Sequence, residues 1–342
     1  MIEAILDQSI LRQGHEISFI LGHKILARTQ QDWFELKGDP LSVSEWEDLK
    51  DYCLQSNEKV QLETKGFVSG LYQSDKFSWK FSFVEKKDCF RAYLSAQNPT
   101  DQIQSNIEYP LFWDALKKEK GIFIIAGERR QGKSALLSEV ITNDQHNKMS
   151  LTGIHSVNQQ QKWPQMDSIV HLGADAVDWD INHVLYEGLQ RIVVDFNTIK
   201  NWKKWIEFAE QGQSVYLSLS LNSLQTLFFR LAADLDASMM SRFLQVFNGA
   251  LLQKISQKVE QKTAVHEILI CRDSERKKLI QYYDQKQNFQ MLSLGSLGLE
   301  AYQSLNQSIL QKLIRRKLDV QSAFAISEAP EELDAQLKKM GL

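Results

Sequence analysis

The segment GIFIIAGERRQGKSALL, residues 121–137, constrains the fold of this chain more than any other part of its sequence. It reads as a short apolar strand, a loop with a glycine at each end, and a helix that opens with Lys133 and Ser134. Gly127, Gly132, Lys133 and Ser134 satisfy the pattern G-x-x-x-x-G-K-S/T without a mismatch. Strand and helix flank the loop as this motif requires, so the sequence predicts a P-loop that binds a nucleotide.

The residue types of this loop suit phosphate binding. Its glycines let backbone N–H groups converge on phosphate oxygens, aided by the partial positive charge of the helix N-terminus. Lys133 is expected to meet the β and γ phosphates of ATP, and Ser134 to offer its hydroxyl to Mg²⁺. Arg129 and Arg130 are unusual in such a turn, and they either add charge to the site or point into solvent. The residues predicted to bind ATP or ADP are Gly127, Glu128, Arg129, Arg130, Gln131, Gly132, Lys133, Ser134 and Ala135.

Hydrolysis of ATP needs a carboxylate in addition to the loop. It stands at the end of a neighbouring strand, where it holds Mg²⁺ through water or activates the attacking water. Asp195 is the candidate, because it ends the apolar run RIVVD. We therefore predict Asp195 as the catalytic residue and as a ligand of Mg²⁺ through water. The alternative is that Asp195 is a polar residue that leaves a buried strand or caps the next helix.

Composition restricts the partners of the chain. Its 342 residues, 43% apolar and 24% charged, are typical of a globular protein of two domains. The formal net charge of −3 gives no overall field that would attract DNA or an anionic bilayer, so no nucleic-acid partner is expected. The three cysteines lie far apart, which suits reduced thiols in the cytoplasm. Runs of about 18 apolar residues are absent, so we expect no direct membrane insertion. Any role at a membrane would depend on a partner protein.

The first part of the chain is predicted to be a compact α+β domain over residues 1–98, followed by a polar linker at 99–106. Helical spacing covers 1–13 and 42–55, and the second helix offers Ser42 and Ser44 as caps. The segments with strand-like alternation are 16–22, 24–30, 32–38, 67–73, 77–87 and 89–97.

Residues 107–290 are predicted to form the P-loop domain, and residues 291–342 a mostly helical C-terminal region. Strands at 190–196 and 214–221 alternate with helices at 201–212 and 239–255, which indicates a mainly parallel sheet with crossover helices. Within the first of these helices, Trp202 and Trp205 invite a nucleic-acid interpretation because lysines separate them. Their helical spacing favours a core face instead.

Taken together, the segments resemble the type IV pilus retraction ATPases, the PilT-like proteins, and more broadly the ATPases of type II and type IV secretion systems. The resemblance extends from end to end and rests on the P-loop segment together with GHEISFILG, CFRAYLSAQ, FLQVFNGALLQKI, AVHEILICRDSERKKLIQ, GSLGLEAYQSLNQSILQKLI and PEELDAQLKKMGL. It implies an N-terminal PAS-like α+β domain, a C-terminal RecA-like P-loop domain in an α/β chain, and a hexameric ring. It also implies that Arg91 lies near the phosphates, and that the ring acts on a pilus or secretion platform protein at the inner membrane.

Several positions depart from the family pattern. The acidic box of the family corresponds to MSLTGIHSV, which contains no carboxylate. In the region of the histidine box, GQSVYLSLSL, Gln213 and Ser220 stand where the histidines would be. Asp195 occupies the position of the Walker B glutamate, and Cys89 replaces the partner of Arg91 in the arginine pair.

These departures predict a degenerate ATPase. It would bind ATP with weak or no hydrolysis and would regulate or assemble with an active motor, as a homomeric or mixed ring in the cytoplasm. The first alternative is an active retraction motor in which Asp195 replaces the glutamate. The second is a structural scaffold that no longer binds nucleotide.

Overall fold

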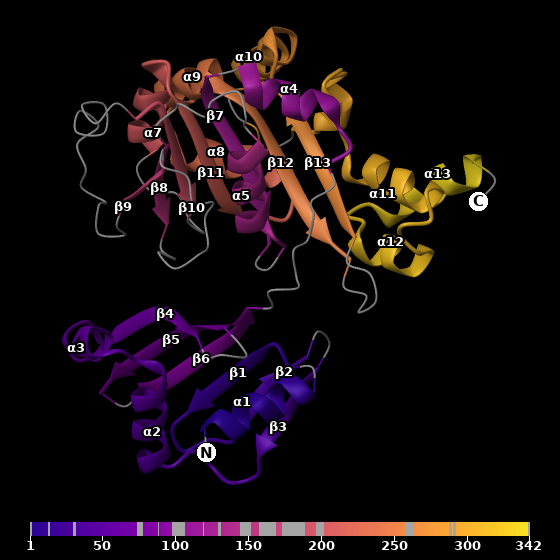
Figure 1. Ribbon diagram of the computed structural model, residues 1–342. Coiled ribbons are helices and arrows are strands. Elements are labelled where there is room, and N and C mark those ends of the chain that lie inside the picture. Colours follow the sequence, from indigo (N-terminus) through magenta and orange to yellow (C-terminus); the bar gives the residue numbers. More distant parts are fainter. Residues whose placement is uncertain are drawn as a thin grey trace. The chain divides into compact units, whose positions relative to one another are not determined.

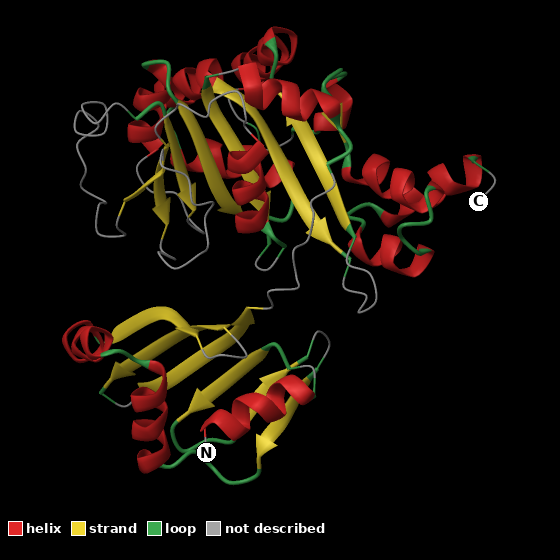
Figure 2. Ribbon diagram, in the orientation of Figure 1, coloured by secondary structure: helices red, strands yellow, loops and turns green. Residues whose placement is uncertain are grey.

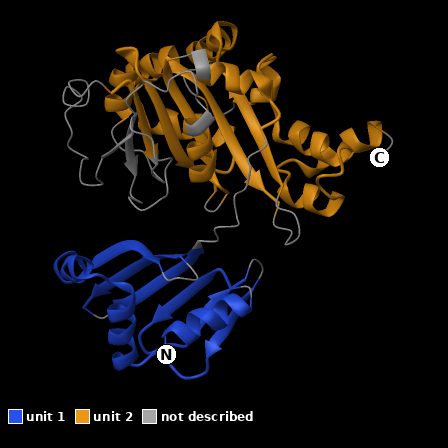
Figure 3. Ribbon diagram, in the orientation of Figure 1, with its two compact units in different colours: residues 1–102 blue, residues 103–342 orange. Residues whose placement is uncertain are grey.

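The computed structural model (Figure 1) divides into two compact units, Met1–Gln102 and Ile103–Leu342. Figure 2 distinguishes helices from strands, and Figure 3 colours the two units. The structure describes residues 2–12, 14–29, 32–73, 78–87, 89–97, 107–118, 120–128, 131–143, 152–156, 169–172, 189–195, 202–256, 263–286, 289 and 292–340. The predicted linker at 99–106 lies outside these residues.

The first unit is a six-stranded antiparallel sheet in the order β3-β2-β1-β6-β5-β4. Its strands are β1 (Glu16–Ile20), β2 (Ile25–Arg28), β3 (Trp33–Lys37), β4 (Phe67–Gln73), β5 (Ser78–Lys86) and β6 (Cys89–Gln97). Its helices are α1 (Ile2–Leu11), α2 (Val43–Cys53) and α3 (Ser56–Lys65). All six predicted strands and both predicted helices are confirmed, whereas α3 was not predicted.

The start of α2 shows why the sequence predicts this unit well. Ser42 accepts a hydrogen bond from the Glu45 backbone N–H, and the Glu45 carboxylate accepts one from the Ser42 N–H. This reciprocal cap satisfies two N–H groups that the first helical turn leaves without partners. One face of α2 then buries Trp46 and Leu49 in the core of the unit. Ser42, not Ser44, is the cap.

The second unit contains an eight-stranded sheet in the order β14-β13-β12-β7-β11-β10-β8-β9. From β12 to β9 all neighbours are parallel, while β13 and β14 are antiparallel to theirs, which confirms a mainly parallel sheet. The strands are β7 (Gly121–Gly127), β8 (Thr152–Ser156), β9 (Ile169–Leu172), β10 (Arg191–Asp195), β11 (Ser214–Ser220), β12 (Phe247–Ile255), β13 (Ala264–Ile270) and β14 (Tyr302–Gln303).

Helices cover both faces of this sheet (Figures 1 and 2). One face packs against α4 (Pro110–Lys118) and α5 (Lys133–Asn143). The other packs against α7 (Trp202–Glu210), α8 (Leu224–Asp234), α9 (Ala237–Val246) and α10 (Asp273–Lys286). The chain continues through the short helix η3 (Leu294–Leu297) to α11 (Leu305–Ile314), α12 (Val320–Ile326) and α13 (Pro330–Lys339). Alternate residues of β7 point to the two faces, so the strand of the P-loop is buried on both sides.

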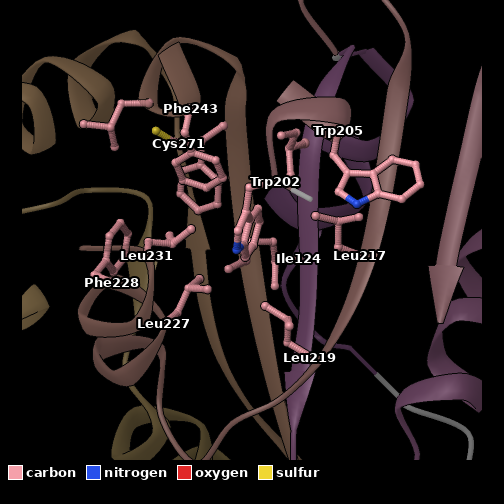
Figure 4. Close-up of a cluster of buried hydrophobic side chains, with 14 of the residues drawn as sticks. Ile124, Trp202, Trp205, Leu217, Leu219, Leu227, Phe228, Leu231, Phe243 and Cys271 are labelled. Atoms are coloured by element: carbon pink, nitrogen blue, oxygen red, sulfur yellow. The ribbon is translucent and has the colours of Figure 1, made fainter. Parts of the chain in front are cut away.

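Trp202 and Trp205 belong to the larger core of this unit (Figure 4). Both side chains are buried beneath α7, beside Leu217 of β11 and Phe243 of α9. The core-face interpretation of the two tryptophans is therefore confirmed.

The helix predicted over residues 239–255 is wrong in its second half. The helix α9 ends at Val246, and Phe247–Ile255 form the strand β12 between β7 and β13. A short apolar run does not by itself distinguish a buried strand from a buried helix. Gly249 carries the signal for a strand, because its φ of +157° suits glycine and a Cβ there would lie 2.5 Å from the Leu269 carbonyl oxygen of the adjacent strand.

Candidate functional site

The P-loop joins the end of β7 to the start of α5. Gly127 is the last residue of β7, Glu128 is exposed, Gln131 and Gly132 follow, and α5 begins at Lys133. Arg129 and Arg130 lie outside the described residues. Gly127 has a φ of +156°, and a Cβ at this position would lie 2.7 Å from the Gln253 carbonyl oxygen. Only glycine allows the loop to leave β7 in this way.

Lys133 lies inside the loop with 8% of its surface exposed. Its Nζ donates hydrogen bonds to the carbonyl oxygens of Gly127 and Glu128, both at 2.8 Å, and lies 3.4 Å from Ser220 Oγ. The loop thus places an ammonium group beside the N-terminus of an eleven-residue helix that includes Ser134 and Ala135. These residues fit a polyphosphate chain, because fixed positive charge and helix N–H groups converge on one point.

Three parallel strands bring the other candidates to the same edge of the sheet. Gly127 of β7 is level with Ser220 of β11, and Asp195, the last residue of β10, is level with Ser218. The backbone of Asp195 therefore ends at the edge that carries the P-loop, two strands away from β7. The side chain of Asp195 lies outside the described residues, so its role stays a prediction.

The two positions of the histidine box separate in the fold. Ser220 stands beside Lys133, whereas Gln213 precedes β11 and accepts a hydrogen bond from Gly121 N–H at the start of β7. Gln213 therefore lies at the opposite edge of the sheet from the P-loop. Arg91 is an exposed residue of β6 in the first unit, level with Ile20 and Val84.

A depression of about 700 Å³ adjoins the P-loop. Its lining comes from the loop, the end of β11 and the first turns of α8, namely Glu128, Ser220, Leu221, Asn222, Thr226, Phe229 and Arg230. Leu221 and Asn222 were not predicted as site residues, and neither were the three residues of α8. Their spacing of three and four along α8 places them on one helix face, which was the available signal.

A buried carboxylate supports the start of α8. Glu267 of β13 is 6% exposed and accepts hydrogen bonds from Leu224 N–H, at 3.0 Å, and from the Tyr302 hydroxyl, at 2.8 Å. Burial raises the pKa of Glu267 above its ordinary value of 4.5, and the two hydrogen bonds oppose this shift. Glu267 therefore links the C-terminal strand β14 to the helix that lines the depression.

The raised pKa of Glu267 makes part of the stability dependent on pH. A carboxyl group with a raised pKa in the folded state stabilises the fold most below about pH 4.5, and this contribution is lost as pH rises through the folded pKa. As pH rises from 4 to 7, we expect the wild type to lose stability relative to Glu267→Gln, measured as the free energy of unfolding. Urea unfolding at several pH values measures it, and a difference that is constant with pH would contradict the shift.

The fold is similar to those of a pilus retraction motor and of two ATPases with solved structures. A solved structure of the pilus retraction motor PilT with bound ADP is similar over 97% of this chain and 98% of that chain, with a TM-score of 0.68 and 16% identity. The ATPase DotB of Legionella pneumophila matches over 95% and 94% of the two chains, with a TM-score of 0.67 and 15% identity. DotB of Yersinia pseudotuberculosis matches over 95% and 92%, with a TM-score of 0.69 and 14% identity.

These similarities confirm the predicted resemblance at the level of fold. No protein-family model and no curated protein sequence matches the chain. Within the part of the chain that the structure describes, every helix is too short or too polar to cross a membrane.

Proposed function

We propose that this chain is an ATP-binding protein of a type IV pilus or a related secretion machine, with a PAS-like first unit and a RecA-like second unit. The observation that carries the proposal is the P-loop, where Gly127 leaves β7 at a φ of +156° and the buried Lys133 ammonium closes the loop. The similarity to PilT with bound ADP over nearly the whole of both chains supports it.

The residues that would hold the nucleotide are those of the loop and of the first turn of α5. Backbone N–H groups from Gln131 to Ser134 would bind phosphate oxygens, and Lys133 would exchange its bonds to loop carbonyls for phosphate. Bound Mg²⁺ supplies charge neutralisation to the phosphates, and Ser134 is the residue that would contact it.

We further propose that hydrolysis is weak or absent. Ser220 lies 3.4 Å from Lys133, at the position of a family histidine, and a neutral serine hydroxyl neither takes up a proton near pH 7 nor carries charge. The segment at the acidic-box position, around β8, contains no carboxylate. Asp195 ends β10 at this edge and would stand at the Walker B position, one methylene shorter than glutamate.

The proposed assembly is a hexameric ring, homomeric or mixed with an active motor, on the cytoplasmic face of the inner membrane beside a pilus or secretion platform protein. Arg91 would approach the phosphates within such a ring. The proposal is supported by the matches to PilT and DotB, which include both units of the chain.

Titration with a fluorescent ATP analogue in Mg²⁺ tests the binding step. Replacing Lys133 by alanine removes charge-assisted hydrogen bonds worth about 1.5–3 kcal/mol, so the Kd should rise by about 10- to 150-fold. Lys203→Ala is the matched control, because Lys203 is an exposed lysine of α7 that forms an ion pair with Glu207 of its own helix. Wild-type protein that shows no binding at millimolar analogue, or equal affinities for the two variants, would contradict nucleotide binding at this loop.

A further inference from the structure

The strand β12 holds the P-loop at three points. The Gln253 carbonyl oxygen lies against Gly127, so closely that a Cβ would not fit between them. The Gln253 side-chain Nε2 donates a hydrogen bond to the Gln131 carbonyl oxygen at 2.6 Å. The Ile255 N–H donates one to Gln131 Oε1 at 2.5 Å. Gln253 thus contacts the residue that begins the loop and a residue near its end.

The Gln253 amide is itself oriented by a second buried side chain. Because the Gln131 carbonyl oxygen can only accept, the amide nitrogen of Gln253 must face it, and Oε1 must face the other way. Oε1 meets His266 Nε2 of β13 at 3.1 Å. Gln253 and His266 are directly opposed in the antiparallel register of β12 and β13, and they are 1% and 2% exposed.

Only one form of the His266 ring suits this position. Its Nε2 must donate a proton to Gln253 Oε1, and burial lowers the pKa of His266 to about 3, with a smaller contribution from Lys312. The ring is therefore neutral at physiological pH and has its proton on Nε2. Neither side chain changes its charge near pH 7, so we infer that the pair acts by holding the P-loop in place.

The helix α11 supports His266 in turn. The His266 backbone N–H donates to Ser308 Oγ of α11 at 3.1 Å. One turn further along α11, Lys312 is 3% exposed and forms an ion pair of 3.3 Å with Glu108. Glu108 also pairs with Arg315 and Lys317, and it lies in the segment that leads into α4. A series of half-buried and buried polar contacts thus runs from the P-loop to α11.

We propose that Gln253 and His266 are positioning residues that hold the P-loop in the shape that receives the phosphates of a nucleotide. This proposal rests on the proposed function, because its effect on affinity requires that the loop binds a nucleotide. The shape of the loop itself can be measured without a ligand. Neither residue is expected to touch ATP, because Gln253 reaches the loop from β12 and His266 acts through Gln253.

Hydrogen exchange of the peptide that covers residues 121–137, without nucleotide, tests the position of the loop. Gln253→Leu keeps the size of the side chain and removes both hydrogen bonds. The amides of residues 131–134 should exchange about 10-fold faster, because the Gln131 carbonyl loses its partner. The matched control is Asn306→Leu, which removes a buried amide of α11 that donates a hydrogen bond to the Ala329 carbonyl oxygen and accepts one from the Ser327 hydroxyl.

Affinity for the fluorescent ATP analogue gives the second measurement. Gln253→Leu should raise Kd about 10-fold and His266→Leu about 3-fold, while the double variant should be no weaker than Gln253→Leu alone. His266→Gln retains a donor and should recover wild-type affinity. If Gln253→Leu does not fold, His266→Leu and Gln131→Ala carry the same comparison, since Gln131→Ala removes the bond from the Ile255 N–H and should speed exchange by about 3-fold.

The outcomes separate this proposal from the proposed function. Unchanged exchange in Gln253→Leu, or equal acceleration in Asn306→Leu, would overturn the positioning role whatever the nucleotide data show. Wild-type protein that binds no ATP would overturn the proposed function, yet faster loop exchange in Gln253→Leu alone would still support the positioning of the loop.

Discussion

Purified protein is expected to release phosphate from ATP at less than about 0.1 per second. Enzymes typically turn over at about 1–1000 per second, and loss of one proton-transfer or charge-stabilising group commonly costs about 10²- to 10⁴-fold. Here Ser220, and a segment without carboxylates, are predicted to stand where the resembled family has such groups. Binding through the loop and Lys133 would remain, because those contacts are already made before the transition state. A steady-state assay of phosphate release, alone and with the fluorescent analogue titration, measures both quantities.

Two variants make this measurement decisive between an inactive and an active protein. Lys133→Ala removes the binding charge, and Asp195→Ala removes the acidic side chain at the end of β10. Turnover near one per second or above, abolished by both changes, would contradict the degenerate hypothesis and favour an active motor that uses Asp195. Tight Mg²⁺-dependent binding, with a low turnover that Asp195→Ala does not change, would support the degenerate hypothesis. Absence of binding would favour the scaffold.

Much of the fold follows from local patterns in the sequence. The P-loop motif predicts β7 and α5 together, since glycine spacing, an apolar strand and a following helix occur in one segment. Alternation predicts the strands of the first unit because one face of each is buried, and Ser42 with Glu45 marks the start of α2. In α7, the spacing of Trp202 and Trp205 predicts the buried face.

Other parts depend on tertiary neighbours that no local pattern records. The strand β12 is apolar along most of its length and buried on both faces, so its period resembles that of a buried helix. Because the segment was predicted as a helix, Gln253 was not recognised as a neighbour of the P-loop. Its contact with Gln131 spans 122 positions of sequence and exists only because β12 pairs with β7.

The candidate site shows the same division. The geometry of the loop could be predicted from its sequence, because Gly127 and Gly132 both have positive φ values, which glycine adopts readily. Gln213 and Ser220 are only seven positions apart, yet an extended strand places them at opposite edges of the sheet. Thr226 and Arg230, which line the depression, lie near the loop because the turn between β11 and α8 brings this helix back to the same edge of the sheet.

The replacement of Phe243 by alanine should lower the free energy of unfolding of the second unit by about 3–5 kcal/mol. Phe243 of α9 is fully buried and packs against Trp202 of α7 (Figure 4), with ring centroids 5.9 Å apart. It also packs against Phe247 of β12, with ring centroids 5.1 Å apart. Its removal leaves a cavity where α7, α9 and the sheet meet. Urea unfolding followed by hydrogen exchange in peptides of β11 and β12 reports on this unit alone.

The matched control for this change is Gln245→Ala, two residues along the same helix, where the side chain is exposed. It should change the stability by less than about 0.5 kcal/mol, since a surface substitution removes no packing. A loss below about 1 kcal/mol in Phe243→Ala would mean that α9 closes over the cavity and that the packing of α7 does not depend on this ring. Since β12 begins directly after α9, a large loss should also speed exchange in the segment that carries Gln253, which connects core packing to the position of the P-loop.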